Sequence, residues 1–330
     1  MPQPLRLTFA SGPYDRFAAL HDGTVRIEGA TLDPVALWPP RLIFDRVAGK
    51  REFDIAEFSC SEFIALTDWG TNPFVAIPVF PSRVFRHGFI CVRRDGPVRA
   101  PGDLEGKRVG VPLYTLTAAI WIRGLLENEY GVDLSRIRWV QGNVMQPGAH
   151  GDPSASPMRR PPEIEINKSE KSLAELLVAG EIDAILGTFV DEAVNSHPDI
   201  VRLFPDYRTR ERDYFRRTGV FPIMHLMTIR REVHEAHPWL AARLFRACEA
   251  AKAAARAKLA SQNGQHVMLP WLLDDLGEVE RLFGGDAWPY GLAPNRAALE
   301  TLMRYMHQQA FIARPIPVDD LFVATDGAGS

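Results

Sequence analysis

The chain has 330 residues, of which 46% are hydrophobic and 24% are charged, a composition that is ordinary for a globular protein with sizeable cores. Its length predicts about two domains, at roughly 150 residues each. The net charge of −3 creates no overall field that would attract nucleic acid. No stretch approaches the roughly 18 uninterrupted apolar residues of a transmembrane helix, so we expect neither a nucleic-acid partner nor a membrane segment.

Strand-like and helix-like segments alternate from the N-terminus onward, which is typical of an α/β fold. The first part of the chain predicts strands over 5–10, 25–37, 53–59 and 74–80, helices over 14–23, 40–53 and 60–70, and a long crossing strand over 85–94. The next part predicts a strand near 108–111, a helix over 117–132, a strand over 137–142, a loop or flap over 146–162, and a helix and buried strand within 171–187. The chain then turns helical, over 237–260 and 294–309.

This order of elements predicts two α/β lobes joined by crossing segments near 83–94 and 216–230. Lobe 1 would comprise residues 1–92 and 222–330, and residues 93–221 would form an inserted lobe 2. Loop ends and helix N-termini would then face a ligand cleft between the lobes.

The three cysteines, Cys60, Cys91 and Cys248, lie far apart and show neither metal-ligand nor redox spacing. Their odd number favours reduced, buried thiols in a reducing compartment. The N-terminal residues lack the basic and apolar regions of a secretory signal. We therefore expect the protein to stay in the cytoplasm.

Residues 108–124, RVGVPLYTLTAAIWIRG, place a strand, a proline break and a helix in succession. The strand stops at Pro112, and the helix opens with Tyr114, Thr115 and Thr117 but no acidic residue. Backbone N–H groups at a helix start favour an anion there. We predict that the two hydroxyls bind an anionic ligand, with Tyr114 as a flat neighbour for an aromatic ring. In the alternative interpretation, Thr115 is an N-cap that closes the helix on itself.

Three basic residues lie within PSRVFRHGF, residues 81–89. Arg83 and Arg86 suit bidentate carboxylate binding, and His87 titrates near neutral pH, as a proton donor should. On an extended strand Arg86 and His87 would point to opposite faces, so at most one would reach a ligand unless the chain bulges. A solvated basic strand end is the alternative, although the apolar neighbours argue against full exposure.

The second crossing contains TGVFPIMH, residues 218–225. His225 ends an apolar run, so it is either buried and hydrogen-bonded or directed at a ligand, and a lone histidine in such a run is usually structural. Its position on a crossing segment makes it a second candidate proton donor. Arg216 and Arg217 precede the run, and we predict that Arg217 contacts an anion while the other guanidinium stays in solvent.

Two polar loops follow predicted strands, where ligand contacts gather in such folds. The loop SGPYDR supplies the candidate ligand contacts Tyr14 and Asp15, although Asp15 and Arg16 would equally well brace the next helix. In AEFSCS, Ser59 offers hydroxyl and backbone donors, and Glu57 is a candidate acid. We predict no cysteine nucleophile, and no Ser-His-Asp, P-loop, GxGxxG or metal-ligand spacing is present.

Several longer segments together resemble one enzyme family. They are FASGPYDR, REFDIAEFS, FVAIPVFPSRVFRHGFICVR, DLEGKRVGVPLYTLTAAIWIRG, GEIDAIL, VRLFPD and RRTGVFPIMHLMTIRREVHEAHPW. The resemblance is to the 4,5-dihydroxyphthalate decarboxylase family and extends from about residue 5 to about residue 245. It implies a type II periplasmic-binding-protein-like fold and an intracellular enzyme on a solute-binding scaffold.

The resemblance further implies decarboxylation of 4,5-dihydroxyphthalate to protocatechuate and CO2. This reaction needs a clamp for the carboxylate that stays, a general acid, and a hydrogen-bond partner for the phenol oxygen. Arg86 or Arg217, with the helix start at Thr115 to Thr117, would be the clamp, and His87 or His225 would donate the proton. No organic cofactor is expected because the ring itself accepts electrons, and a divalent metal ion is left open.

Two other functions stay open. A cytoplasmic solute-binding module would bind a small aromatic or carboxylate ligand without catalysis, and a decarboxylase could act on another hydroxylated aromatic acid. The expected lack of an export signal and the proton-capable histidines favour catalysis. Subunit number is also open, because the apolar positions of residues 239–259 suit a homo-oligomer and a core face equally well.

Overall fold

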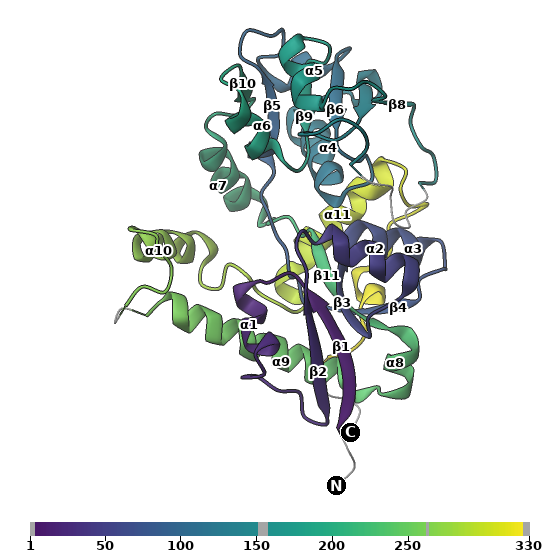
Figure 1. The fold of residues 1–330 in the computed structure, drawn as a ribbon, viewed down its shortest axis with the longest axis vertical. Coiled ribbons are helices and arrows are strands. Elements are labelled where there is room, and N and C mark those ends of the chain that lie inside the picture. The colour runs from purple at the N-terminus through teal and green to yellow at the C-terminus, as the bar shows by residue number, and fades with distance from the viewer. Residues whose placement is uncertain (1–3, 151–157, 262–263, 326–330) are drawn as a thin grey trace. The chain divides into compact units, whose positions relative to one another are not determined.

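The computed structural model describes residues 4–150, 158–261 and 264–325. The chain divides into two compact units: unit 1 comprises Met1–Arg83, Ile223–Leu299 and Ile316–Ser330, and unit 2 comprises Val84–Pro222 and Glu300–Pro315. Each unit has its own β-sheet with helices packed on it (Figure 1). The predicted α/β class is therefore confirmed.

Unit 1 is built on a five-stranded sheet with the strand order β2-β1-β3-β11-β4. The strands are β1 (Leu5–Ser11), β2 (Ala30–Ala36), β3 (Ile55–Ser59), β4 (Phe74–Ile77) and β11 (His225–Arg230). β1 is parallel to β2 and β3, whereas β11 is antiparallel to β3 and β4. A strand from a distant part of the sequence thus lies between β3 and β4.

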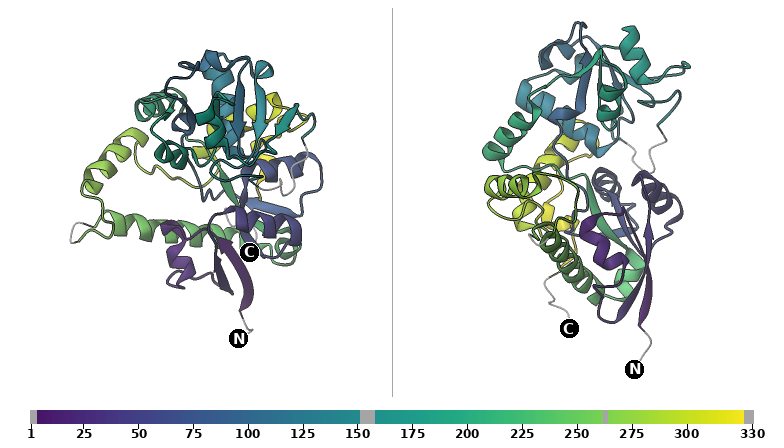
Figure 2. Two further views of the ribbon diagram at one scale, coloured as in Figure 1. Left: turned by 45° about the horizontal axis from the view of Figure 1, so that its top comes forward. Right: turned by 60° about the vertical axis from the view of Figure 1, so that its left-hand side comes forward.

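The helices of unit 1 pack on this sheet and on one another. They are α1 (Asp15–His21), α2 (Arg41–Lys50), α3 (Cys60–Asp68), α8 (Arg231–Ala236), α9 (Trp239–Leu259), α10 (Leu272–Phe283) and the first residues of α11 (Arg296–Gln308). α9 lies beside α1 (Figures 1 and 2), and its Leu240 and Leu244 share a core cluster with Phe9 and Phe17. A core face therefore explains the apolar positions of α9.

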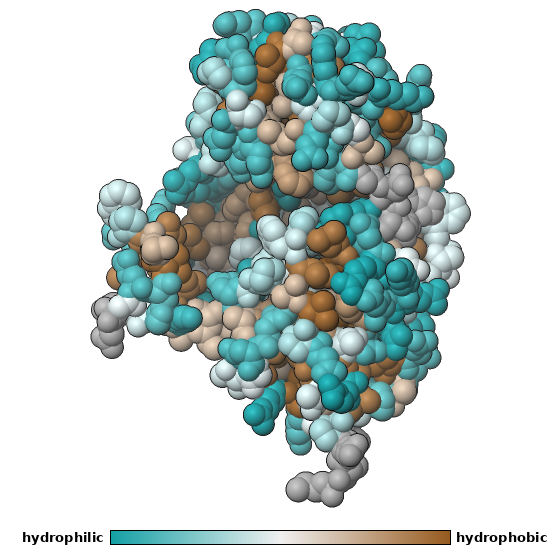
Figure 3. All heavy atoms as spheres, in the orientation of Figure 1, coloured by the Kyte–Doolittle hydropathy of each residue, from teal (hydrophilic) through white to brown (hydrophobic). Residues whose placement is uncertain are grey.

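Apolar side chains also lie on the surface around α10. Met268, Leu269, Trp271 and Val279 are exposed, and apolar surface gathers at this helix in Figure 3. Even so, none of the helices in the described ranges combines the length and the hydropathy that crossing a bilayer requires.

Unit 2 is built on a six-stranded sheet with the order β10-β5-β9-β6-β7-β8. The strands are β5 (Ile90–Arg93), β6 (Arg108–Val111), β7 (Arg138–Gln141), β8 (Ile164–Ile166), β9 (Ala184–Leu186) and β10 (Ile200–Arg202). The four strands from β9 to β8 are parallel, and β5 is antiparallel to both of its neighbours. The helices are α4 (Thr117–Tyr130), α5 (Leu173–Ala179), α6 (Val190–Ser196), α7 (Tyr207–Thr218) and the rest of α11.

The long strand predicted over 85–94 is wrong in its first half. His87–Phe89 form a 3-10 turn, η1, and only Ile90–Arg93 are a strand. Gly88 explains the turn, because its N–H donates to Oε1 of Glu211 at 3.2 Å and a Cβ there would lie 2.8 Å from the Tyr207 ring. The backbone of η1 is therefore closed against α7 instead of being extended.

The units differ from the predicted lobes at residues 84–92, at Pro222, which belongs to unit 2, and at residues 300–315. Residues 84–92 belong to unit 2 because β5 pairs with β9 and β10. Residues 300–315 also belong to unit 2, where the ring of Tyr305 packs edge-on against Trp121, 5.5 Å between centres, and lies against Gly124. Part of the predicted flap, residues 151–157, lies outside the described residues.

Candidate active site

A carboxylate and an imidazole on neighbouring strands form a close pair in unit 1. Glu57 lies on β3 and His225 begins β11, opposite Ser59 in the antiparallel register. Side chains two positions apart on a strand share a face, so Glu57 and His225 are diagonal neighbours across the two strands. Nδ1 of His225 lies 2.5 Å from Oε1 of Glu57.

Glu57 is fully buried and is surrounded by hydrogen-bond donors. The backbone N–H of Gly12 donates to Oε2 at 2.9 Å, and the hydroxyl of Tyr14 donates to Oε1 at 2.9 Å. An ionised carboxylate accepts hydrogen bonds only, so it satisfies these two donors together with an Nδ1–H of His225. Buried carboxylates are costly without such partners, and the loop over residues 12–14 supplies two of them.

One ring nitrogen of His225 is hydrogen-bonded to Glu57 and the other is not. With Nδ1 on Glu57, Nε2 has no hydrogen-bond partner within the described residues, and 17% of the side chain stays exposed. The ring of Phe44 packs edge-on against the imidazole, 4.8 Å between centres. Glu57 thus fixes the tautomer and orientation of the imidazole, an arrangement that leaves Nε2 to exchange a proton.

The other predicted contacts of unit 1 have structural partners. Asp15 Oδ1 accepts from the backbone N–H of Arg16 at 2.8 Å and from its guanidinium at 3.2 Å, so the bracing role expected as an alternative is present. Ser59 is the N-cap of α3, and its Oγ accepts from the N–H of Glu62 at 3.4 Å. Buried Arg83 donates to Oδ1 of Asn295 at 2.7 Å, and burial lowers the pKa of Arg83 to about 9.

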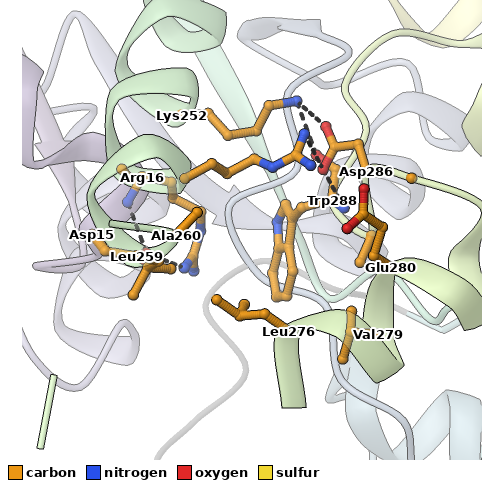
Figure 4. A pocket seen from close by; sticks show the side chains of 14 residues that line it. Asp15, Arg16, Lys252, Leu259, Ala260, Leu276, Val279, Glu280, Asp286 and Trp288 are labelled. Carbon is orange, nitrogen blue, oxygen red and sulfur yellow. Dashed lines mark hydrogen bonds and ion pairs between the residues drawn. The ribbon is translucent and has the colours of Figure 1, made fainter. Parts of the chain in front are cut away.

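A cavity of about 360 Å³ lies beside Arg16 in unit 1. Apolar side chains of α9 and α10 line it, the ring of Trp288 reaches toward Leu276, and the Lys252–Asp286 ion pair lies at its edge (Figure 4). The guanidinium of Arg16 lies 4.0 Å from the ring centre of Tyr14 and 4.8 Å from that of Trp288. Arg16 therefore connects the wall of this cavity to Tyr14, the residue that bonds Glu57.

In unit 2, Arg86 and His87 are both buried. The guanidinium of Arg86 lies 4.7 Å from the ring centre of Phe89; burial lowers its pKa to about 9, and the charge of Glu211 opposes this shift. Burial raises the pKa of Glu211 to about 7, although the N–H groups of Gly88 and His87 and the charge of Arg86 favour its ionised form.

His87 is surrounded by aromatic rings. Tyr130, Phe204 and Tyr214 contact its imidazole edge-on, with centres 5.5 to 6.2 Å away. Burial lowers the pKa of His87 to about 4, and the charges of Arg210 and Arg217 add to this effect. The imidazole is therefore neutral near pH 7, which argues against His87 as the proton donor that its sequence context predicted.

Arg217 shares a cavity of about 240 Å³ with His87, and Arg210, Glu129 and Tyr214 are among its other lining residues. The side chain of Arg217 is 60% exposed and forms an ion pair with Glu129. Arg216, the neighbour expected in solvent, is 62% exposed and pairs with Asp213. Any anion bound by Arg217 would therefore compete with the carboxylate of Glu129.

The structure at the start of α4 differs from the alternative in which Thr115 is the N-cap. The N-cap is Leu116, without a side-chain cap bond, and Thr117 is the first helical residue, so an N-cap role for Thr115 is wrong. Thr115 and Thr117 are both buried. The predicted absence of an acidic residue in the first turn of α4 is confirmed.

Tyr114 is packed inside unit 2 by a buried arginine. The guanidinium of Arg123 lies 3.6 Å from the ring centre of Tyr114 and donates to the Tyr114 carbonyl at 2.9 Å. Arg123 also donates to Oε1 of Gln309 at 2.8 Å, and burial lowers its pKa to about 10. One face of the Tyr114 ring is thus covered by Arg123, which limits its use as a platform for a substrate ring.

Comparison with known proteins places the chain in a family. Over 322 residues it is 38% identical to a 4,5-dihydroxyphthalate decarboxylase of Comamonas testosteroni, and the match covers 96% of both chains. The chain belongs to the 4,5-dihydroxyphthalate decarboxylase family. A 4,5-dihydroxyphthalate decarboxylase of Pseudomonas putida is 36% identical over 216 residues, which cover 64% of this chain and 82% of that protein. No protein-family model matches the chain.

Solved structures identify the fold of this family member. The periplasmic aliphatic sulphonate binding protein SsuA of Escherichia coli superposes with a TM-score of 0.54 over 98% of each chain, at 12% identity. At that identity the likeness concerns the fold alone, which is the type II periplasmic-binding-protein fold. The resemblance drawn from the sequence is thereby confirmed for both family and fold.

For this decarboxylase homologue, the sequence predicted single site residues better than it predicted which residues contact one another. Tyr14 and His225 both bond Glu57 in unit 1, Ser59 lies opposite His225 in the strand register, and His87 and Arg217 line one cavity in unit 2. Glu211 was missed, since nothing in its arginine-rich segment indicates a buried carboxyl. In the described ranges no group of three or more His, Cys, Asp or Glu side chains could hold a metal ion.

Proposed function

We propose that this family member decarboxylates a hydroxylated aromatic carboxylate, 4,5-dihydroxyphthalate in the first instance, to give protocatechuate and CO2. His225 is the general acid in this proposal, and Glu57 holds its Nδ1. The observation that carries the proposal is the 2.5 Å contact between Nδ1 of His225 and the fully buried Glu57. The 38% identity to the Comamonas testosteroni decarboxylase supports the choice of substrate.

The chemistry needs one proton for each turnover. A phenol oxygen para to the departing carboxylate pushes electron density into the ring, and the ring carbon that bears the carboxylate takes the proton from Nε2. The bond to the carboxylate then breaks, its electron pair restores the aromatic ring, and CO2 leaves. The imidazole regains its proton from solvent, and a general acid of this kind typically contributes about 10²- to 10⁴-fold.

His225 suits this task better than His87 because of its surroundings. Its Nδ1 lies 2.5 Å from the Glu57 carboxylate, which orients the ring, and part of its side chain is exposed. Burial lowers the pKa of His87 to about 4, and the charges of Arg210 and Arg217 further disfavour its imidazolium form. A histidine that is neutral at pH 7 carries a single ring proton, and so it lacks the extra proton that an imidazolium could donate.

Unit 2 carries separate candidates for anion binding. A ring carboxylate needs a cationic partner, for which Arg86 and Arg217 are the proposed residues, with the N–H groups at the start of α4 beside Thr115 and Thr117 as candidate donors. The lack of a side-chain cap at Leu116 supports this use of the helix start. No organic cofactor is needed in this scheme because the ring accepts the electrons.

A solute-binding module without catalysis is the second candidate, favoured by the fold that the chain shares with periplasmic binding proteins. Incubation of the protein with 4,5-dihydroxyphthalate separates the two. Stoichiometric protocatechuate and CO2 would support the decarboxylase, whereas saturable binding without product would support the module. Turnover only of other hydroxylated aromatic acids in a panel would keep the reaction and change the substrate.

A further inference from the structure

Oε1 of Glu57 has two partners. The hydroxyl of Tyr14 donates to it at 2.9 Å, and Nδ1 of His225 lies 2.5 Å from the same atom. Glu57 has no exposed surface, so water does not compete for this oxygen. Each donor that binds a carboxylate oxygen draws negative charge from that oxygen. It thereby weakens the hydrogen bond of the same oxygen to the second donor.

We infer that Tyr14 is a positioning residue of the proposed reaction: its hydroxyl shares Oε1 of Glu57 with the Nδ1–H of His225, and so sets how strongly Glu57 stabilises the imidazolium. This inference rests on the proposed function only for its catalytic consequence. It replaces the direct substrate contact that the sequence predicted for Tyr14.

The loop before α1 is shaped for this bond. The N–H of Tyr14 donates to the Gly12 carbonyl at 2.8 Å, which folds the Tyr14 ring back over Gly12. A Cβ on Gly12 would lie 2.6 Å from Cζ of Tyr14, so only glycine leaves room for the ring. The N–H of Gly12 meanwhile donates to Oε2 of Glu57 at 2.9 Å, and one short loop therefore binds both oxygens of the carboxylate.

Arg16 fixes the ring of Tyr14 from the other side. Its Nε donates to the Pro81 carbonyl at 2.6 Å, and its guanidinium lies between the rings of Tyr14 and Trp288. The indole N–H of Trp288 donates to the Phe80 carbonyl at 2.9 Å. Because both anchors are backbone carbonyls, the stack holds Tyr14 in the rotamer that reaches Glu57.

Several charged groups on the elements around the pair have partners elsewhere. Arg41 of α2 pairs with Asp45 and with Glu62 of α3, Arg16 pairs with Asp15, Arg230 at the far end of β11 pairs with Asp54 and with Glu232 of α8, and β4 has no titratable side chain. Glu57 is the carboxylate that contacts His225, and Tyr14 is the side chain that shares its Oε1.

NMR titration of His225 in the full-length protein tests the inference without requiring activity. In Tyr14→Phe, Oε1 loses one donor and its charge falls on His225 alone, so the pKa of His225 should rise. Replacement of Tyr14 by 3-fluorotyrosine keeps the shape and strengthens the donor, and should move the pKa the other way. An unchanged pKa in both variants, or shifts of the reverse sign, would overturn the inference.

Tyr290→Phe is the matched control, because the hydroxyl of buried Tyr290 has no hydrogen-bond partner among the described residues. Its removal should leave the titration of His225 unchanged, and an equal shift there would also overturn the inference. The pH at which turnover falls should move with the His225 pKa in Tyr14→Phe. If the wild-type protein shows no decarboxylation, the proposed function fails, while the titration still decides whether Tyr14 acts on His225.

Discussion

Nδ1 of His225 lies 2.5 Å from Oε1 of Glu57, although 168 positions separate the two residues in the chain. The contact exists because β11 pairs with β3 in unit 1, with His225 opposite Ser59. A buried carboxylate that accepts from an imidazole in this way holds one ring nitrogen and leaves the other for chemistry.

Glu57→Gln should lower kcat by between about 10- and 1000-fold with little change in substrate affinity. The single amide oxygen can accept from Gly12 or from Tyr14 but not from both, because these donors bind different oxygens of Glu57, and the amide cannot stabilise a positive charge on His225. Steady-state kinetics with a separate binding measurement would check this. Glu52→Gln is the matched control, since exposed Glu52 pairs with Arg46 at the surface, and a loss of kcat there equal to that of Glu57→Gln would contradict the assignment.

Gly12→Ala should lower kcat by more than its effect on the free energy of unfolding explains. The new Cβ would lie 2.6 Å from Cζ of Tyr14, so the ring must move and its bond to Glu57 is lost, at a cost of about 1–3 kcal/mol from overpacking. Gly49→Ala, where nothing lies within 4 Å of the added Cβ, is the control for folding. Denaturant unfolding and turnover of both variants would be compared, and full activity in Gly12→Ala would speak against the Tyr14–Glu57 bond.

His87 should make unit 2 less stable in acid. Burial lowers its pKa from 6.5 to about 4, so its contribution to stability is complete above about pH 6.5 and is lost as the pH falls through about 4. His87→Phe, which keeps an aromatic ring beside Tyr130, Phe204 and Tyr214, should remove a loss of roughly 3 kcal/mol at most over that range. Unfolding free energies from pH 7 to pH 4 would show a flatter profile in the variant; an identical slope would contradict the assignment.

Glu211 should have the opposite effect. Burial raises its pKa from 4.5 to about 7, so its contribution is complete below about pH 4.5 and is lost as the pH rises through about 7. Glu211→Gln mimics the protonated carboxyl and should therefore flatten the fall in stability between pH 4.5 and 7. The same unfolding series measures it, and a variant that is destabilised equally at every pH would show that the charge of Glu211 plays no part.

The parts of the fold that were predicted from sequence are those with a strong local signal. β1 alternates apolar and polar residues, β3 has apolar residues around Glu57, and α9 has a long periodic apolar face that packs on α1. α7 was missed because its segment, YRTRERDYFRRT, is dominated by arginine and buries only Glu211 and Tyr214. The turn at Gly88 was missed because it depends on contacts with Tyr207 and Glu211, which are over a hundred positions away.

The candidate site shows the same division. Tyr14, Ser59 and His225 could each be predicted as a candidate from the sequence, because Tyr14 follows a strand, Ser59 ends one and His225 begins one. That Glu57 binds both Tyr14 and His225 could not be predicted, since it depends on the insertion of β11 between β3 and β4. The N-cap proposed for Thr115 failed because the helix begins two residues later, after Leu116.

The central claim is that His225 delivers the proton that replaces the departing carboxylate. The most direct test is single-turnover conversion of 4,5-dihydroxyphthalate by the wild-type protein and by His225→Ala, with substrate affinity measured separately. The account predicts protocatechuate and CO2 from the wild type, and a rate about 10²- to 10⁴-fold lower in His225→Ala with affinity within a few-fold of wild type. A wild-type rate in His225→Ala would contradict it.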